Sequence, residues 1–286
     1  MVFLYKKLKH KFFIKIIVKR NNNLKNRFQK MGINDFKEFI KKLELQALET
    51  AEERIPLYMK IGLKDAESIL DVGCGPGTVT LDIAHLTKGK VVGVDSSKKM
   101  VDVASEILKD FENVKIFVAS AENLPFEDNS FEITTCNLVL MWSKNPQKVV
   151  DEMARVTKKG GCVLASLEPD YGGKLHFPEN PKVDPIFAGE AIKRKGGDPH
   201  IGRKLRFLFV NAGLKTEIGI GNNRIWSCEE DKSYYTHARD FYVKALKESG
   251  LSQKEIDKWE FDYLKSLDDG VQLNFFPQFY AIGWKL

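Results

Sequence analysis

The stretch Asp71-Val-Gly-Cys-Gly-Pro-Gly77 follows the apolar segment Ser68-Ile-Leu70 and precedes a segment with helical periodicity. Its three glycines stand at alternate positions, so the chain can turn sharply and a ligand can lie directly on the backbone at a helix N-terminus. In a dinucleotide-binding loop the third glycine comes three residues after the second, where this chain has Thr78. The loop therefore predicts a strand, a ligand-binding turn and a helix, but departs from the NAD or FAD pattern.

A second buried strand is predicted at Val91-Val-Gly-Val-Asp95, which begins fourteen residues after the loop. An acidic residue ends this strand. Nucleotide-binding sheets need an acceptor for two ribose hydroxyls at this position, the carboxyl end of the second strand. We therefore expect Asp95 to bind a ribose.

The next segments place this chain near a known family. The apolar run Val114–Val118 leads into Ala119-Ser-Ala-Glu-Asn-Leu-Pro-Phe126, and Ser130-Phe-Glu-Ile-Thr-Thr-Cys-Asn137 begins a fourth strand. This order resembles the class I S-adenosylmethionine (SAM)-dependent methyltransferases, and among them the type 11 or ubiquinone and menaquinone biosynthesis type. The resemblance extends from about Ala66 to Leu167. It implies SAM as the cofactor.

The resemblance also implies a cofactor site. Members of the family often have an aspartate that accepts from the adenine amino group where this chain has Ser120, so we expect Glu122 or backbone atoms of Ala121 to take that role. Asn137, at the end of the fourth strand, is expected to border the transferred methyl group. The cofactor-binding residues predicted in this way are Asp71, Gly73, Cys74, Gly75, Gly77, Asp95, Ser96, Ala121, Glu122 and Asn137.

Strands and helices continue to alternate after this point. Asn145-Pro146 predicts the start of a helix that Lys158-Lys-Gly-Gly161 ends, and Cys162–Leu167 is a fifth strand. This alternation predicts an α/β fold with a Rossmann-like, doubly wound and mostly parallel sheet, which binds ligands at the carboxyl ends of its strands. The resemblance adds seven strands, an antiparallel terminal strand at Asn274–Trp284 and a helical cap. We expect one methyltransferase domain at 31–286, with its cofactor half at about 66–167.

The pattern changes after Glu168. Residues 169–199 are rich in glycine and proline, and a helical stretch follows at 201–213, so we expect a substrate cap inserted at about 168–212. Its candidate catalytic residues are Asp170, Tyr171 and His176. The alternative is that each is an ordinary surface residue of a loop.

Charge is divided unevenly along the 286 residues, whose net charge is +6. Residues 1–30 hold ten Lys or Arg and no acid, so the remaining 35 basic and 39 acidic residues give a balance of −4. A mildly acidic body argues against nucleic acid as a partner. In the basic extension, Lys11, Lys15 and Lys19 oppose an apolar face, which suits peripheral contact with an anionic membrane. The alternative is an extension without that role, with Met31 as the working initiator.

Cysteine and histidine spacing gives no sign of a metal site. The four cysteines lie far apart without a C-x-x-C pair, and the five histidines lack ligand spacing, so we predict no metal and a reducing, cytoplasmic setting. No run approaches the roughly 18 apolar residues of a membrane span.

These observations predict a SAM-dependent methyltransferase that transfers a methyl group by in-line displacement to a small-molecule or quinone-like acceptor. One alternative is a methyltransferase for a protein or tRNA, with the basic extension as a docking arm. A second is a SAM-binding protein without catalysis. The sequence names neither the acceptor atom nor the oligomeric state, and a general base is needed only if the acceptor must lose a proton.

Overall fold

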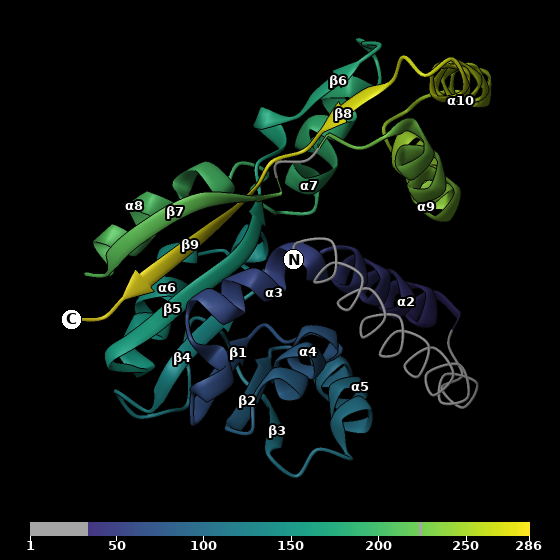
Figure 1. The fold of residues 1–286 in the computed structure, drawn as a ribbon. Helices are drawn as coiled ribbons and strands as arrows, with labels where there is room; N and C mark the ends of the chain where they lie inside the picture. The colour runs from purple at the N-terminus through teal and green to yellow at the C-terminus, as the bar shows by residue number, and fades with distance from the viewer. Residues whose placement is uncertain (1–33, 223–224) are drawn as a thin grey trace, which may run out of the picture.

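The computed structural model describes residues 34–222 and 225–286, which form a sheet covered by helices and a further group of helices at one end (Figure 1). The first five strands run parallel to one another, β9 is antiparallel to β5, and β7 is antiparallel to β9. This confirms the predicted Rossmann-like sheet with an antiparallel terminal strand. In the order of the sheet the strands are β3 (Val114–Val118), β2 (Lys90–Asp95), β1 (Ser68–Val72), β4 (Phe131–Cys136), β5 (Thr157–Pro169), β9 (Gln278–Trp284) and β7 (Lys215–Asn222).

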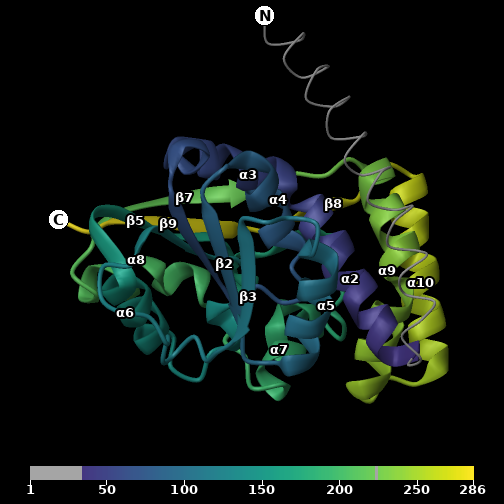
Figure 2. The same cartoon turned by 90° about the horizontal axis from the view of Figure 1, so that it is seen from below.

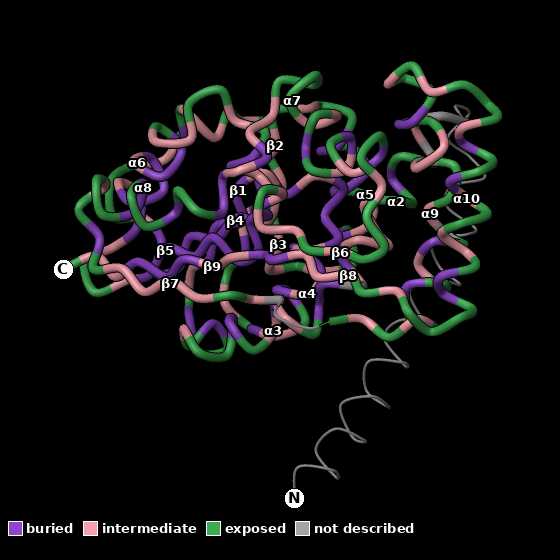
Figure 3. The backbone as a smooth tube through the Cα atoms, turned by 90° about the horizontal axis from the view of Figure 1, so that it is seen from above, coloured by how far each residue is buried: buried purple, intermediate pink, exposed green. Residues whose placement is uncertain are grey.

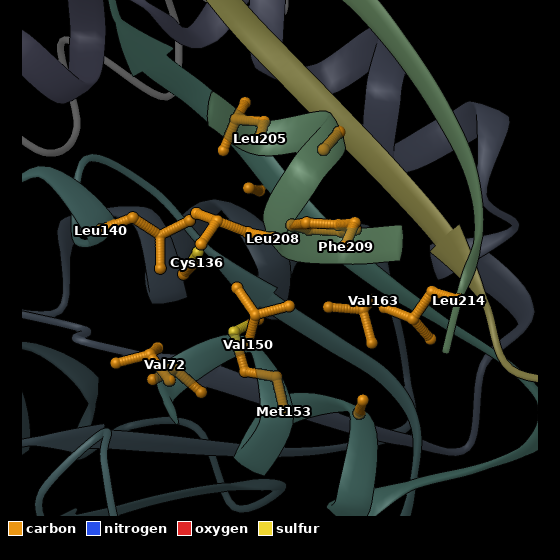
Figure 4. Close-up of a cluster of buried hydrophobic side chains, with 14 of the residues drawn as sticks. Val72, Cys136, Leu140, Val150, Met153, Val163, Leu205, Leu208, Phe209 and Leu214 are labelled. Atoms are coloured by element: carbon orange, nitrogen blue, oxygen red, sulfur yellow. The ribbon is translucent and has the colours of Figure 1, made fainter. Parts of the chain in front are cut away.

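Alternate side chains of the central strands pack on opposite faces of the sheet. In β1, Leu70 and Val72 belong to an apolar core with α6 (Pro146–Val156) and α8 (Leu205–Asn211), and Figure 4 shows part of it. Ile69 faces the other side, where it packs with side chains of helices α3 and α4. The helices near that second face are α2 (Asn34–Glu49), α3 (Ala51–Lys60), α4 (Thr78–Leu86) and α5 (Lys98–Leu108). Both faces of β1 are covered, so its apolar side chains Ile69, Leu70 and Val72 are all buried.

Helix boundaries follow the capping signals closely. The Asn145 side chain accepts from the Lys148 amide at the start of α6, with Pro146 in the first helical position. This helix ends at Val156, earlier than the predicted 158–161, because Thr157 already pairs with β4 as the first residue of β5. Strand β5 is therefore longer than predicted at both ends. At its far end, Glu168 and Pro169 pair with β9.

The cap has its own apolar core and is built from two stretches of the chain. Its elements include β6 (Leu175–Phe177), η4 (Ile186–Glu190), α7 (Ala191–Arg194), α9 (Cys228–Glu248), α10 (Gln253–Asp268) and β8 (Leu273–Phe275). Strands β6 and β8 pair, and α9 and α10 pack around buried Tyr235, Ile256 and Trp259. This differs from the expected range of 168–212, since α8 packs on the sheet and residues after 225 join the cap.

The helices α9 and α10 lie side by side at one end of the sheet, as Figures 1 and 2 both show. Figure 3 shows the buried strands at the centre of the molecule and mixed exposure along α9 and α10. None of the described helices combines the length and apolarity needed to cross a bilayer. The membrane contact predicted for residues 1–30 lies outside the described residues.

Candidate functional site

The glycine loop connects β1 to α4 and takes left-handed backbone conformations at three positions. Gly73, Gly75 and Gly77 have φ values of 70°, 53° and 82°. A Cβ atom at Gly73 would lie 2.4 Å from Val139 Cγ2, and one at Gly77 would lie 2.9 Å from the Cβ of Ala104. A Cβ atom at Gly75 would have no neighbour within 4 Å. Two glycines are thus needed for packing, whereas Gly75 faces open space that a ligand can occupy.

Asp95 ties the end of β2 to this loop. Its carboxylate accepts from the amide of Gly75 at 3.0 Å and from the amide of Ser97 at 2.8 Å, one on each oxygen. Each carboxylate oxygen has about two acceptor positions, so both keep capacity for a ribose hydroxyl. Ser96, which lies between Asp95 and Ser97 in the chain, is exposed. This arrangement suits the role predicted for Asp95.

Asp71 lies beneath the loop and is only 1% exposed. Its carboxylate accepts from the hydroxyl of Thr80 at 2.6 Å, and burial raises its pKa to about 7. The neighbouring Cys74 is also buried, which raises the pKa of its thiol well above the usual value, and its amide donates to Val94 at 2.9 Å. These contacts hold the loop on the sheet, whereas direct contact of Asp71 or Cys74 with a ligand stays a prediction.

A buried arginine reaches the same region from α3. Arg54 is fully buried and donates to Asp82 of α4 at 2.6 Å and to the hydroxyl of Thr50 at 2.8 Å. Its positive charge counteracts the rise in the pKa of Asp71. The sequence offers little sign of this contact, because Arg54 and Asp82 lie 28 residues apart.

The carboxyl end of β4 is held by a residue that the sequence analysis did not select. Glu168, which is fully buried in β5, accepts from three successive amides at 139–141, at 2.9, 3.0 and 3.3 Å. Burial raises its pKa to about 7 against the effect of these amides. Next to this contact, Asn137 accepts from the hydroxyl of Ser166 at 2.8 Å. The sequence signal that could have identified Glu168 was an acidic residue at the carboxyl end of an apolar strand.

The loop after β3 carries the residues expected at the adenine. Glu122 accepts from the hydroxyl of Ser143 at 2.9 Å and from the amide of Asn145 at 3.2 Å, so its carboxylate connects this loop to the start of α6. The hydroxyl of Ser120 accepts from the amide of Glu122 at 3.2 Å. Contact of adenine with Glu122 or Ala121 stays a prediction.

Of the candidate catalytic residues, Asp170 is engaged by an arginine. It is 2% exposed and accepts from Nε and Nη2 of Arg203 at 2.5 and 2.7 Å. Burial acts to raise its pKa, but the bonds from Arg203 hold the pKa below its usual value. A carboxylate that is ionised and paired in this way is a weak base. The Asp170 carboxylate also accepts a hydrogen bond from the amide of Gly172, so its contacts favour a role in holding the turn at Tyr171–Gly173.

Tyr171 lines a cavity of about 500 Å³ between α2, α9 and the cap strands. Its ring packs against Phe276 with 4.7 Å between centroids, and burial raises the pKa of its hydroxyl to about 12. The phenol is therefore protonated at neutral pH and can donate a hydrogen bond to a ligand. The aromatic lining residues are Tyr171, Phe187, Trp226, Tyr234, Tyr242 and Phe276.

His176 lines a second, smaller cavity of about 280 Å³. Its Nε2 lies 2.6 Å from Oδ1 of Asp184. The two cavities share four lining residues, so they adjoin each other. Tyr280 of β9 lines neither of these two cavities, and its hydroxyl donates to Glu217 at 3.0 Å.

Comparison with known proteins shows similarity to methyltransferases in sequence and in fold. A family model described as a methyltransferase domain matches residues 70–165. An uncharacterised methyltransferase of Schizosaccharomyces pombe is 29% identical over 229 residues, which cover 73% of this chain and 82% of the relative. Residues 70–165 therefore match a methyltransferase domain, and the comparisons support a SAM-dependent methyltransferase.

Two further relatives of this methyltransferase differ in how much of it they match. A demethylmenaquinone methyltransferase of Staphylococcus aureus is 39% identical over 106 residues, 36% of this chain and 44% of that protein. The alignment thus spans under half of that relative. The solved structure of the YcgJ protein of Bacillus subtilis is 21% identical, covers 82% of this chain and 99% of its own, and superposes with a TM-score of 0.56, which shows a shared fold.

The methyltransferase domain that residues 70–165 match supports SAM as the cofactor of this enzyme. Two features of its own geometry fit that molecule: the open space at Gly75 and the two carboxylate oxygens of Asp95 beside it. Among residues 34–222 and 225–286, no cluster of three His, Cys, Asp or Glu side chains has the geometry to hold a metal ion.

Proposed function

We propose that this methyltransferase transfers the methyl group of SAM to a small molecule with an apolar, quinone-like or aromatic body. The observation that carries the proposal is the cavity of about 500 Å³ with six aromatic side chains in its lining. Ligand pockets of roughly 300 to 1,000 Å³ with mostly apolar walls are typical of small-molecule sites. A cavity of this size between helices and cap favours such an acceptor over a macromolecule.

The position of the cavity supports this proposal. Gln278 lines it from the first residue of β9 and pairs with Pro169 at the carboxyl end of β5. Thr50 lines it from the junction of α2 and α3, where it accepts from Arg54. The cavity therefore borders the edge of the sheet at which parallel strands bind ligands.

Methyl transfer then depends mainly on how the chain holds its two ligands. When bound, SAM supplies a methyl group that is already activated for displacement. Gly75 and Asp95 would hold the cofactor, and the aromatic walls would exclude water and align the acceptor with the methyl group. Alignment of this kind supplies roughly 7 to 11 kcal/mol of a barrier.

The candidate acid and base residues take different proposed roles. Tyr171 donates a hydrogen bond to the acceptor in the larger cavity. His176, oriented by Asp184, accepts a proton when the acceptor has one to lose. Asp170 supports Tyr171 through the turn that its bond to Arg203 stabilises.

Labelled SAM tests this proposal directly. The full-length protein is incubated with methyl-labelled SAM and a cell extract, and the label is measured in lipid, small-molecule, RNA and protein fractions. We expect label in the lipid or small-molecule fraction. Label confined to protein or RNA would contradict the proposal and favour a macromolecular acceptor.

A variant that fills the cavity makes the test specific. Ala191 lines the cavity from the start of α7, so Ala191→Phe should remove labelling while SAM binding and the melting temperature are retained. Lys193→Phe, at an exposed position of the same helix, is the matched control and should label at the wild-type rate. Full labelling by Ala191→Phe would exclude this cavity as the acceptor site.

A further inference from the structure

Lys174 lies at the junction of the two cavities. It follows the turn at Tyr171–Gly173, precedes β6, and lines both the larger and the smaller cavity. Its ammonium nitrogen lies 5.6 Å from the ring centroid of Phe187, which also lines both. The cationic group is therefore held at an aromatic wall and is directed toward the enclosed space.

The two carboxylates whose charges act on Lys174, those of Asp184 and Asp231, also contact other groups. Asp184 contacts His176 and accepts from the amide of Asn180 at 2.6 Å. Asp231 is buried and accepts from the side-chain amide of Asn274 at 3.2 Å. Both carboxylates act on Lys174 only at longer range.

The Lys174 ammonium has no carboxylate in contact with it among the described residues. Within 34–222 and 225–286, no side chain forms an ion pair or a hydrogen bond with it. Burial lowers its pKa, while Asp184 and Asp231 oppose that effect. Lys174 is partly exposed, so its ammonium is accessible from the cavity, and a bound anion would supply the contacting counter-ion that these residues do not.

We propose that Lys174 binds an anionic group of the acceptor, such as a carboxylate, phenolate, sulfonate or phosphate, while the apolar body of the acceptor fills the aromatic cavity. This inference rests on the proposed function and narrows its substrate class to acidic amphiphilic molecules. The ion pair orients the acceptor because Lys174 stands at one end of the larger cavity, against its border with the smaller one. The aromatic walls bind the apolar body, and the charge of Lys174 adds affinity for the anionic group and fixes the orientation of the acceptor.

Two fluorescent probes of nearly the same shape test the inference without the natural acceptor. One is 8-anilinonaphthalene-1-sulfonate, and the other is N-phenyl-1-naphthylamine, which lacks the sulfonate. Both are titrated into the wild type, Lys174→Met and Lys174→Arg. We expect Lys174→Met to raise the Kd of the sulfonate probe roughly 10- to 100-fold, as for loss of a charged contact. The neutral probe should change less than about threefold, and Lys174→Arg should keep most of the sulfonate affinity.

Control variants decide whether the effect belongs to this site. Lys247→Met removes the same charge from an exposed position of α9 and should leave both Kd values unchanged. Ala191→Phe should weaken both probes. An equal loss of sulfonate affinity in Lys174→Met and Lys247→Met overturns the inference, and so does sulfonate binding that persists in Ala191→Phe. Probe binding needs no turnover, so failure of methyl transfer to small molecules would contradict the proposed function separately.

Discussion

Replacement of Asp95 by alanine tests the cofactor site most directly. In the structure the carboxylate holds the amides of Gly75 and Ser97, and we expect its remaining acceptor positions to bind both ribose hydroxyls of SAM. The substitution therefore removes two kinds of contact. Both amides belong to residues that are partly exposed, so water can replace the carboxylate there.

The two losses have different magnitudes. A lost hydrogen bond whose amide water can reach costs about 1 kcal/mol, so the folded state should be destabilised by roughly 1 to 2 kcal/mol. Loss of charged acceptors for two ribose hydroxyls should weaken SAM binding by roughly 2 to 4 kcal/mol. This corresponds to an increase of about 30- to 900-fold in Kd.

Calorimetric titration with SAM measures the affinity, and Asp102→Ala serves as the control. Asp102 is exposed on α5 and pairs with Lys98, so its loss changes the charge by the same amount and should leave Kd unchanged. Titration with a 2′-deoxy analogue of S-adenosylhomocysteine separates ribose binding from loop geometry. Asp95→Ala should reduce the preference for the ribose form over the deoxy form. An unchanged Kd in a folded variant, or an unchanged preference, would refute the ribose role.

The remaining predictions concern stability and the loop. Arg54→Met leaves the Asp82 carboxylate without its buried partner and should lower the free energy of unfolding in urea by roughly 3 to 5 kcal/mol; a loss below about 1 kcal/mol would contradict the buried pair. Because burial raises the pKa of Glu168 from 4.5 to about 7, the folded state holds its proton more tightly than the unfolded chain, and stability falls as pH rises through that window. Between pH 4.5 and 7, the Glu168→Gln variant should lose less free energy of unfolding than the wild type, by up to about 3 kcal/mol. Urea unfolding at several pH values measures this difference, and the same pH profile in both proteins would contradict the raised pKa of Glu168. Gly73→Ala should lower the melting temperature more than Gly75→Ala, since only the former meets a neighbouring side chain, whereas Gly75→Ala should weaken SAM binding; equal melting temperatures would contradict the packing argument.

Several parts of this fold were predictable because their signals are local. The start of α6 at Pro146, the capping box of Ser252 and Glu255 on α10, and the glycine loop after β1 each depend on residues within a few positions of one another. Prediction failed where a boundary depends on a distant strand. The end of α6 is an example, since pairing with β4 draws residue 157 into β5.

By itself, the sequence determined the alternation of strands and helices, the glycine loop and the acid at the end of β2, and through these the resemblance to SAM-dependent methyltransferases. Only the tertiary structure decided which acidic side chains are already held by other groups of the protein. Asp170 accepts hydrogen bonds from Arg203, which lies 33 positions away in the sequence. Glu168 accepts from the amides after β4, which lie 27 to 29 positions away. It also decided the cavity, whose lining comes from α2, the turn after β5, α9 and the strands near the C-terminus. The physical reason is that helix periodicity, caps and glycine turns arise from neighbouring residues, whereas a cavity and its ion pairs exist only after distant segments pack together.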